Sequence, residues 1–142
     1  MYQAMNATMR TYQGTLPMKS SIIIALGIVA FLAAQSGASA ADVAKGKELF
    51  SEQCAACHSV QPGQNGIGPT LAGIYDKPAA STPGFEFSGA LKASKIVWTA
   101  SALDKFLEDP QSDVPGTKMP YMGLANAAER ADVIAYLETL SD

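Results

Sequence analysis

Cys54-Ala55-Ala56-Cys57-His58 contains both cysteines and the only histidine of the 142 residues. Two thiols separated by two residues and followed directly by an imidazole form the attachment pattern of a c-type haem. The thiols form thioether bonds with the two vinyl groups of the porphyrin, and the imidazole reaches the iron from the same side. Because the chain has one histidine, a second histidine ligand is excluded, and the sixth ligand is another residue or is missing.

Other roles for this motif fit the chain less well. A thioredoxin-like Cys-x-x-Cys motif belongs to a βαβ pattern, which the sequence does not show. A structural zinc site normally takes four protein ligands, more than two cysteines and one histidine supply. A disulfide between residues so close in sequence would constrain almost nothing. We therefore predict covalent haem attachment at Cys54 and Cys57, with His58 as an axial ligand to the iron.

The N-terminal region has the pattern of a secretory leader. The first forty residues carry no Asp or Glu, whereas all 13 acidic residues lie later. Lys19 precedes an apolar run, Ile22 to Ala34, and Ala38-Ser39-Ala40 supplies the small residues of a cleavage site. We therefore predict a signal peptide over 18–40, cleavage after Ala40 and a periplasmic location.

The alternative is a leader that stays attached as a membrane anchor, although the apolar run falls short of the roughly twenty residues of a spanning helix. Met18-Lys19-Ser20-Ser21 forms a complete start of a signal peptide, so we interpret residues 1–17 as a start-site artefact. Residues 41–142 are expected to form one domain, small for a self-sufficient apolar core, which the haem would complete. This domain has eight basic and 13 acidic side chains, a net charge of −5, which argues against nucleic-acid binding.

Helical periodicity and capping residues predict an all-α fold. Asp42 is expected to cap a first helix that runs into the haem motif, with apolar residues three and four positions apart. Thr99 is expected to cap a longer helix that ends at Pro110. Asn126, followed by Glu129, is typical of the start of a final helix.

The segments between these helices contain many turn-forming residues. We expect one turn of helix around Leu71–Tyr75 and a short helix over 88–94. The segment 109–123 holds three prolines and two glycines, and is expected to be an extended loop. No strand pair or internal repeat is visible.

The sixth ligand is sought among the two methionines of the domain, Met119 and Met122. Met119 lies in Pro115-Gly116-Thr117-Lys118-Met119-Pro120, where two prolines restrict the backbone. Because a stiff loop suits a side chain that must hold its sulfur on a metal, we predict Met119 as the second axial ligand, with Met122 as the alternative. Ligation by His and Met raises the reduction potential of haem iron. It also leaves no open position for dioxygen or peroxide, so the expected activity is one-electron transfer rather than catalysis.

With these motifs in place, the chain from Asp42 to Leu140 resembles the class I cytochromes c, most closely the mitochondrial cytochromes c and bacterial cytochromes c2. The resemblance is carried by segments spread over almost the whole domain: Gly46 and Phe50, Cys54–His58, Gly68-Pro69-Thr70-Leu71, Pro83-Gly84-Phe85, Trp98, Pro115–Met119 and Ala135-Tyr136-Leu137. It implies the small cytochrome c fold, with helices packed around one haem. It also implies that Gly46 lets the first helix lie close to the last, with Phe50 and Tyr136 packed at the crossing.

The resemblance implies further roles around the haem. The Pro69 carbonyl would accept the Nδ1–H of His58 and orient the imidazole. Trp98 would donate its indole N–H to one haem propionate, and Thr117 would hydrogen-bond near the other. Tyr121 would pack over the methionine side of the haem near its exposed edge.

The chain also departs from the family pattern. Phe87 and Phe106 stand where the family often has tyrosines, and Leu91 where it has an asparagine, so we expect fewer polar contacts around the haem. Gln111-Ser112-Asp113 and Ala125-Asn126-Ala127-Ala128 stand where mitochondrial-type proteins carry lysines around the haem edge. Electrostatic steering by a basic ring is therefore expected to be weak.

These observations predict a soluble periplasmic one-electron carrier with one covalent haem c per chain. The expected partners are membrane redox complexes, namely a cytochrome bc1-type complex and an oxidase or a photosynthetic reaction centre. No nucleic acid and no small-molecule substrate is expected. Two alternatives stay open: a cytochrome subunit anchored by its leader, and a haem enzyme or gas sensor with a labile sixth ligand.

Overall fold

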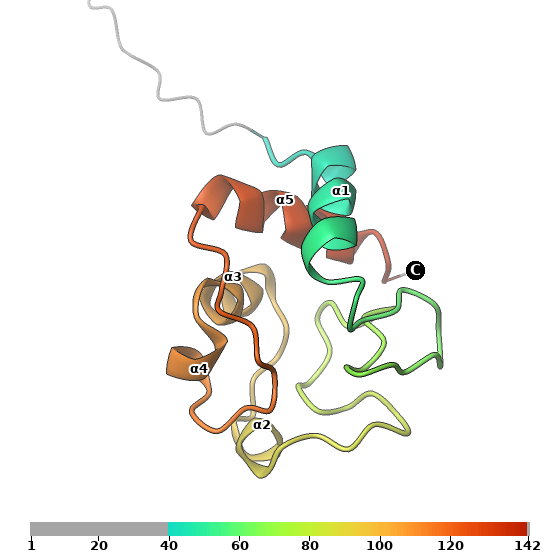
Figure 1. The fold of residues 1–142 in the computed structure, drawn as a ribbon, viewed down its shortest axis with the longest axis vertical. Helices are drawn as coiled ribbons and strands as arrows, with labels where there is room; N and C mark the ends of the chain where they lie inside the picture. The colour runs from blue at the N-terminus through green and yellow to red at the C-terminus, as the bar shows by residue number, and fades with distance from the viewer. Residues whose placement is uncertain (1–39, 142) are drawn as a thin grey trace, which may run out of the picture. The chain divides into compact units, whose positions relative to one another are not determined.

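The computed structural model describes residues 40–141, so the predictions for residues 1–17 and for the signal peptide up to residue 39 lie outside the described residues. The helices of this part are α1 (Val43–Gln53), α2 (Gly89–Ala93), α3 (Ala100–Glu108), α4 (Pro110–Asp113) and α5 (Ala127–Glu138), shown in Figure 1. The β pairing within it is limited to an isolated bridge between Pro78 and Val97, which confirms the predicted all-α class. Among residues 40–141, no helix has the length and apolar character needed to cross a bilayer.

Side chains cap the starts of these helices, at Asp42, Thr99 and Asn126 as the sequence predicts and also at Ser88. The Asp42 carboxylate accepts hydrogen bonds from the amides two and three residues later, at 2.9 and 3.1 Å. Asn126 does the same at the start of α5, at 3.0 and 3.5 Å. The hydroxyls of Ser88 and Thr99 accept from the amides three residues later, at 3.1 and 3.3 Å. Each cap satisfies main-chain donors that the first turn leaves unpaired, and so sets where the helix begins.

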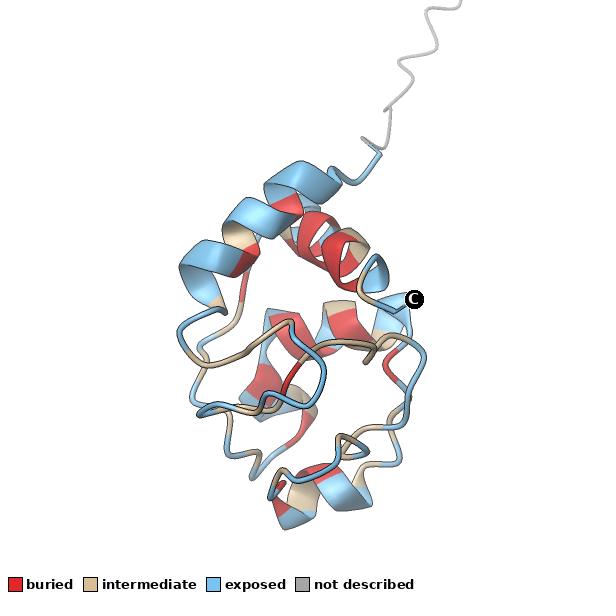
Figure 2. Cartoon of the chain, turned by 90° about the vertical axis from the view of Figure 1, so that its right-hand side faces the viewer, coloured by how far each residue is buried: buried red, intermediate tan, exposed pale blue. Residues whose placement is uncertain are grey.

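Helices α1 and α5 cross in close contact, as Figures 1 and 2 show. A Cβ added to Gly46 would lie 1.9 Å from the carbonyl oxygen of Asp132 in α5. Next to this contact the rings of Phe50 and Tyr136 pack edge to face, with centroids 5.5 Å apart. Buried positions are spread around much of α5 but confined to one side of α1. The crossing and its aromatic pair therefore form as the resemblance implies.

Three details of the predicted elements are wrong. The segment around Leu71–Tyr75 forms turns instead of helix, because Gly73 takes a left-handed conformation (φ 68°) that interrupts any helical run. The predicted loop 109–123 contains α4, which begins with Pro110 at its first position and is capped by Asp109. Helix α1 ends at Gln53, so the haem motif continues it as a turn instead of forming its last residues.

Candidate functional site

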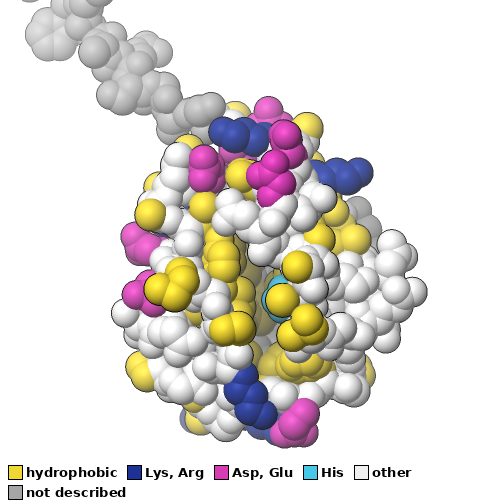
Figure 3. All heavy atoms as spheres, viewed as in Figure 1, with side chains coloured by type: hydrophobic (Ala, Val, Ile, Leu, Met, Phe, Trp, Pro, Cys, Tyr) yellow, Lys and Arg dark blue, Asp and Glu magenta, His cyan; other side chains and the backbone are white. Residues whose placement is uncertain are grey.

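Residues 40–141 enclose a cavity of about 540 Å³. Apolar side chains from α1, α3 and α5, such as Phe50, Phe106 and Leu137, form its inner wall. The loops 54–88 and 114–126 supply most of its remaining lining. Figure 3 shows the opening as a hollow bordered by hydrophobic side chains, with His58 visible in its wall. The volume falls within the range of roughly 300–1,000 Å³ that cofactor and ligand sites occupy.

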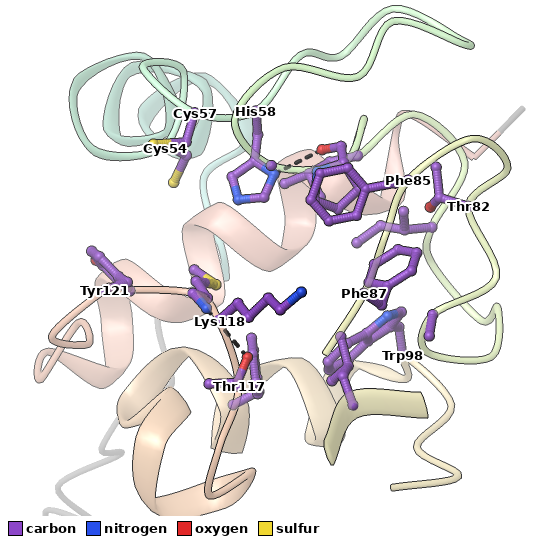
Figure 4. Close-up of a pocket in the computed structure, with 18 of the residues that line it drawn as sticks. Cys54, Cys57, His58, Thr82, Phe85, Phe87, Trp98, Thr117, Lys118 and Tyr121 are labelled. Carbon is purple, nitrogen blue, oxygen red and sulfur yellow. Dashed lines mark hydrogen bonds between the residues drawn. The ribbon is translucent and has the colours of Figure 1, made fainter. Parts of the chain in front are cut away.

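Both cysteines lie in the turn that follows α1. The amides of Cys57 and His58 donate to the Cys54 carbonyl, at 3.0 and 2.9 Å. This tight turn places the two thiols and the imidazole along the same edge of the cavity, as Figure 4 shows. Burial first, and the neighbouring Cys57 second, raise the pKa of the Cys54 thiol to about 11. In the unmodified chain the Cys54 thiol therefore keeps its proton at neutral pH.

The His58 imidazole is held from behind by the main chain. Its Nδ1 lies 2.8 Å from the Pro69 carbonyl oxygen, and a carbonyl can only accept, so Nδ1 carries the proton. Gly68 lies against the same ring, since a Cβ added there would come within 2.4 Å of Cε1 and 2.7 Å of Nδ1. The plane of the ring is thus fixed, and in the neutral imidazole Nε2 is the nitrogen that carries the lone pair.

The loop behind His58 is itself held by two side chains, Asn65 and Thr70, for which the sequence predicts no role. The Asn65 amide accepts from the Thr70 main-chain N–H at 2.9 Å and donates to the Pro83 carbonyl at 3.0 Å. The buried Thr70 hydroxyl donates to the Gln61 carbonyl at 2.8 Å. These bonds support Pro69, whose carbonyl holds the imidazole. Thr70 lies in a stretch that carries the family resemblance, whereas no local pattern distinguishes Asn65.

The Met119 segment borders the cavity opposite His58. Thr117 and Lys118, the two residues before Met119, lie across the cavity from the imidazole in Figure 4, and Met119 is among the lining residues. The Met119 N–H donates to the Thr117 hydroxyl at 3.4 Å. Met122, the alternative ligand, has 92% of its surface exposed and is not part of the lining.

The aromatic residues singled out from the sequence also border the cavity. Trp98 is buried, and its ring packs on Phe106 with centroids 5.0 Å apart. Tyr121 lines the cavity on the side of Lys118, as Figure 4 shows, and its hydroxyl donates to the exposed Gln53 side chain at 2.7 Å. Burial is the main reason that the pKa of Tyr121 is raised, so this hydroxyl remains a donor. Gln53 had no predicted role, because its contact spans 68 positions of sequence.

The residues present fit a haem. Two thiols on one edge can form thioether bonds, an oriented imidazole presents Nε2 to the cavity, and a methionine belongs to the opposite wall. Apolar residues dominate the rest of the lining, and Phe87 and Leu91 are among them. The cavity therefore provides covalent attachment, two candidate axial ligands and an apolar surrounding.

Comparison with known proteins agrees with this geometry. A family model described as cytochrome c matches residues 43–141. Cytochrome c of Euglena viridis is 45% identical over 101 residues, which cover 71% of this chain and 99% of the relative. Cytochrome c2 of Rhodomicrobium vannielii is 43% identical over 120 residues, which cover 84% of this chain and 95% of the relative. Among solved structures, cytochrome cH from Methylobacterium extorquens is 41% identical, with a TM-score of 0.65 over 69% of this chain and 98% of that one.

These matches confirm the small cytochrome c fold that the resemblance implied. They also confirm a covalently bound haem c, for which Cys54 and Cys57 occupy the Cys-x-x-Cys positions. They show an electron-transfer protein and not an enzyme. The chain therefore belongs to the cytochrome c family.

Proposed function

We propose that this cytochrome is a soluble periplasmic electron carrier whose haem iron is held by His58 and Met119. The observation that carries the proposal is the 2.8 Å hydrogen bond between His58 Nδ1 and the Pro69 carbonyl. Because this bond keeps the proton on Nδ1, the lone pair of Nε2 is directed to a metal, as in other metal sites with an oriented histidine. Met119 is the methionine on the opposite wall.

When bound, the haem supplies an iron that changes its oxidation state by one electron. The protein's contribution is to set the preference between the two states. The Met119 thioether is a soft ligand that favours ferrous iron, and His/Met ligation raises the reduction potential. The apolar lining around Phe87, Leu91 and Phe106 keeps water away from the site. With both axial positions filled, these residues favour electron exchange over binding of a small molecule.

Three further residues are proposed to contact the haem periphery. Trp98 is assigned one propionate, because its indole N–H donates to no acceptor among residues 40–141 and the residue lines the cavity. The Thr117 hydroxyl accepts from the Met119 amide, so its own hydrogen is free to donate to the other propionate. Tyr121 covers the methionine side at the opening.

The proposed location and partners rest on the leader and on the chemistry of the site. The secretory pattern over 18–40 supports export, and c-type haem is attached outside the cytoplasm. A carrier in that compartment would exchange electrons with membrane complexes, of which a cytochrome bc1-type complex and an oxidase or reaction centre are the proposed donor and acceptor.

The surface around the cavity supports a partner whose docking face is not strongly acidic. Of the side chains that line the cavity, Glu86 and Lys118 are those with a full charge near neutral pH. Glu86 is paired with Lys92 at 2.7 Å, and this partner lowers the pKa of its carboxyl. Ile67 and Met122 are exposed apolar side chains, and Ile67 belongs to the lining. We propose that docking relies on apolar and neutral polar contacts more than on a basic ring.

The spectrum of the reduced protein with and without carbon monoxide tests the proposed ligands. Carbon monoxide should change the spectrum of the parent protein little, because Met119 would occupy the sixth position of the iron. In Met119→Ala that position would be open, so this variant should bind carbon monoxide fully. Met122→Ala is the matched control and should behave as the parent. A parent that binds carbon monoxide readily would instead indicate the sensor or enzyme alternative. Fractionation of the source cells separately tells a soluble carrier from one anchored by its leader.

A further inference from the structure

The side chain of Gln111 contacts the main chain of the proposed ligand segment. Its Nε2 donates to the Met119 carbonyl at 2.8 Å and also lies 3.4 Å from the Thr117 carbonyl. One amide therefore contacts two carbonyls of the turn that carries Met119. The contact joins α4 to a segment that has no helical structure of its own.

Helix α4 is a firm base for this contact although it is only one turn long. The Asp113 carboxylate is 7% exposed and forms an ion pair with Lys105 of α3 at 2.6 Å. Pro110 is fully buried, and the Asp109 side chain accepts from the Ser112 amide at 3.0 Å. These contacts fasten α4 at its start and at its end. Gln111 therefore projects from a fixed position.

The segment that Gln111 contacts makes few other hydrogen bonds among the described residues. Among the described residues, the main chain of residues 118–123 makes no backbone–backbone hydrogen bond, and the next such bond joins the Leu124 amide to the Leu107 carbonyl at 2.8 Å. The Met119 amide makes only the long 3.4 Å contact with Thr117. Apart from those of Gln111, the side-chain hydrogen bond that joins this stretch to another described element is the one between Tyr121 and Gln53. The side chains of Met119 and Tyr121 also pack against the hydrophobic core, so the stretch is held mainly by apolar contact.

We propose that Gln111 is a positioning residue that keeps the Met119 segment closed against the cavity. The inference deepens the proposed function, since it rests on Met119 being the second axial ligand. Gln111 acts through the main chain of Met119 and does not touch the iron. Loss of its donor raises the fraction of time for which the segment, and with it the sulfur, moves away from the cavity.

The test compares Gln111→Glu and Gln111→Ala with Gln64→Glu and Gln64→Ala in the haem-loaded protein. Glutamate keeps the size of the side chain but removes the N–H donors. Gln64 is exposed and its side chain makes none of the hydrogen bonds found among residues 40–141, so it controls for the charge change. The first readout is the rate at which imidazole binds the oxidised protein when imidazole is saturating and opening of the segment limits the rate. The second readout is hydrogen exchange of the Met119 amide, with the Leu103 amide of α3 as an internal reference.

Both Gln111 variants should raise the imidazole rate and the Met119 exchange rate roughly two- to tenfold, the effect of one hydrogen bond. Exchange at Leu103 and the melting temperature should change little. Unchanged rates in the Gln111 variants would overturn the proposal, and so would an equal rise in the Gln64 variants. If Met119 is not the ligand, the parent will lack the absorption band that charge transfer between the methionine sulfur and the iron produces. Hydrogen exchange at the Met119 amide does not depend on that band, so it still tests the role of Gln111.

Discussion

Gly68 leaves room for the His58 imidazole, which lies directly against it. A Cβ at this position would lie 2.4 Å from Cε1 and 2.7 Å from Nδ1 of His58, far inside van der Waals contact. The ring cannot retreat without losing its hydrogen bond to the Pro69 carbonyl. The absence of a side chain at residue 68 is therefore part of how the imidazole is oriented.

We expect Gly68→Ala to displace the imidazole and to lower stability by about 1–3 kcal/mol, the usual cost of forcing a methyl group into a packed site. Guanidinium unfolding of the haem-loaded protein measures the stability, and the visible spectrum reports any change at the iron. Gly89→Ala is the matched control, since no atom lies within 4 Å of the added Cβ and the residue begins α2. If the two variants unfold at the same denaturant concentration, Gly68 does not constrain the ring.

Sequence reasoning works for side chains whose chemistry is local. The attachment motif and the choice of Met119 over Met122 follow from residue type and a short pattern, whereas the Pro69 contact of His58 is implied by the family resemblance. The observed geometry is compatible with each. The roles of Gln53 and Gln111 could not be predicted from the sequence. A glutamine belongs to no recognisable motif here, and both side chains bond to groups that only folding brings near.

The crossing of α1 and α5 places one helix against the backbone of the other. At Gly46 an added Cβ would lie 1.9 Å from the Asp132 carbonyl oxygen and 3.1 Å from the Cβ of Tyr136. We expect Gly46→Ala to push the helices apart, loosen the Phe50–Tyr136 pair and destabilise the protein by about 1–3 kcal/mol. Thermal unfolding measures this, with Gly89→Ala again as the neutral reference. If Gly46→Ala unfolds at the same temperature as the parent, the close contact of α1 and α5 at Gly46 does not contribute to stability.

The cap of α4 makes that helix sensitive to acid. Hydrogen bonds from the main chain and side chain of Ser112 lower the pKa of the Asp109 carboxyl below its ordinary value of 3.8. Because the folded pKa is the lower one, the cap contributes its full stability above the unfolded pKa and loses it as pH falls through the folded value. NMR titration of the Asp109 carboxyl carbon should give a midpoint below 3.8, and Ser112→Ala should move it upward. A midpoint at or above 3.8 would contradict the capping contact.

The predicted helices are correct where the capping residue and the apolar periodicity agree. They are wrong where the conformation of one proline or one glycine determines whether a helix forms. Asp42, Thr99 and Asn126 mark the starts of α1, α3 and α5 as their side chains suggest. The pattern does not predict helix α4, because Pro110 ends one helix and, after the Asp109 cap, also begins the next. The predicted turn of helix near residue 73 fails on the conformation of one glycine.

The distribution of charge over the protein bears on how partners approach it. The domain from residue 41 has a net charge of −5 before the haem propionates are counted, and the full charges on the cavity lining are limited to Glu86 and Lys118. The stretches Gln111-Ser112-Asp113 and Ala125-Asn126-Ala127-Ala128 contain no lysine or arginine, so they supply no basic ring of the kind that the resemblance to mitochondrial-type proteins implies. Long-range attraction to an acidic docking face is therefore weak.

Electron transfer to a mitochondrial-type oxidase should consequently be slow and nearly independent of ionic strength. Ala125 is exposed in the loop before α5, so Ala125→Lys adds a cation there without removing a side-chain contact. The rate for this variant should rise roughly two- to fivefold at low salt, consistent with about 1 kcal/mol of added attraction, and return to the parent value at high salt. Ala125→Glu, of opposite charge, should be no faster than the parent at any salt concentration. Stopped-flow rates over a salt series measure this. A parent rate that falls steeply with added salt would show that charge steering operates, since salt screens long-range attraction but leaves apolar contact largely intact.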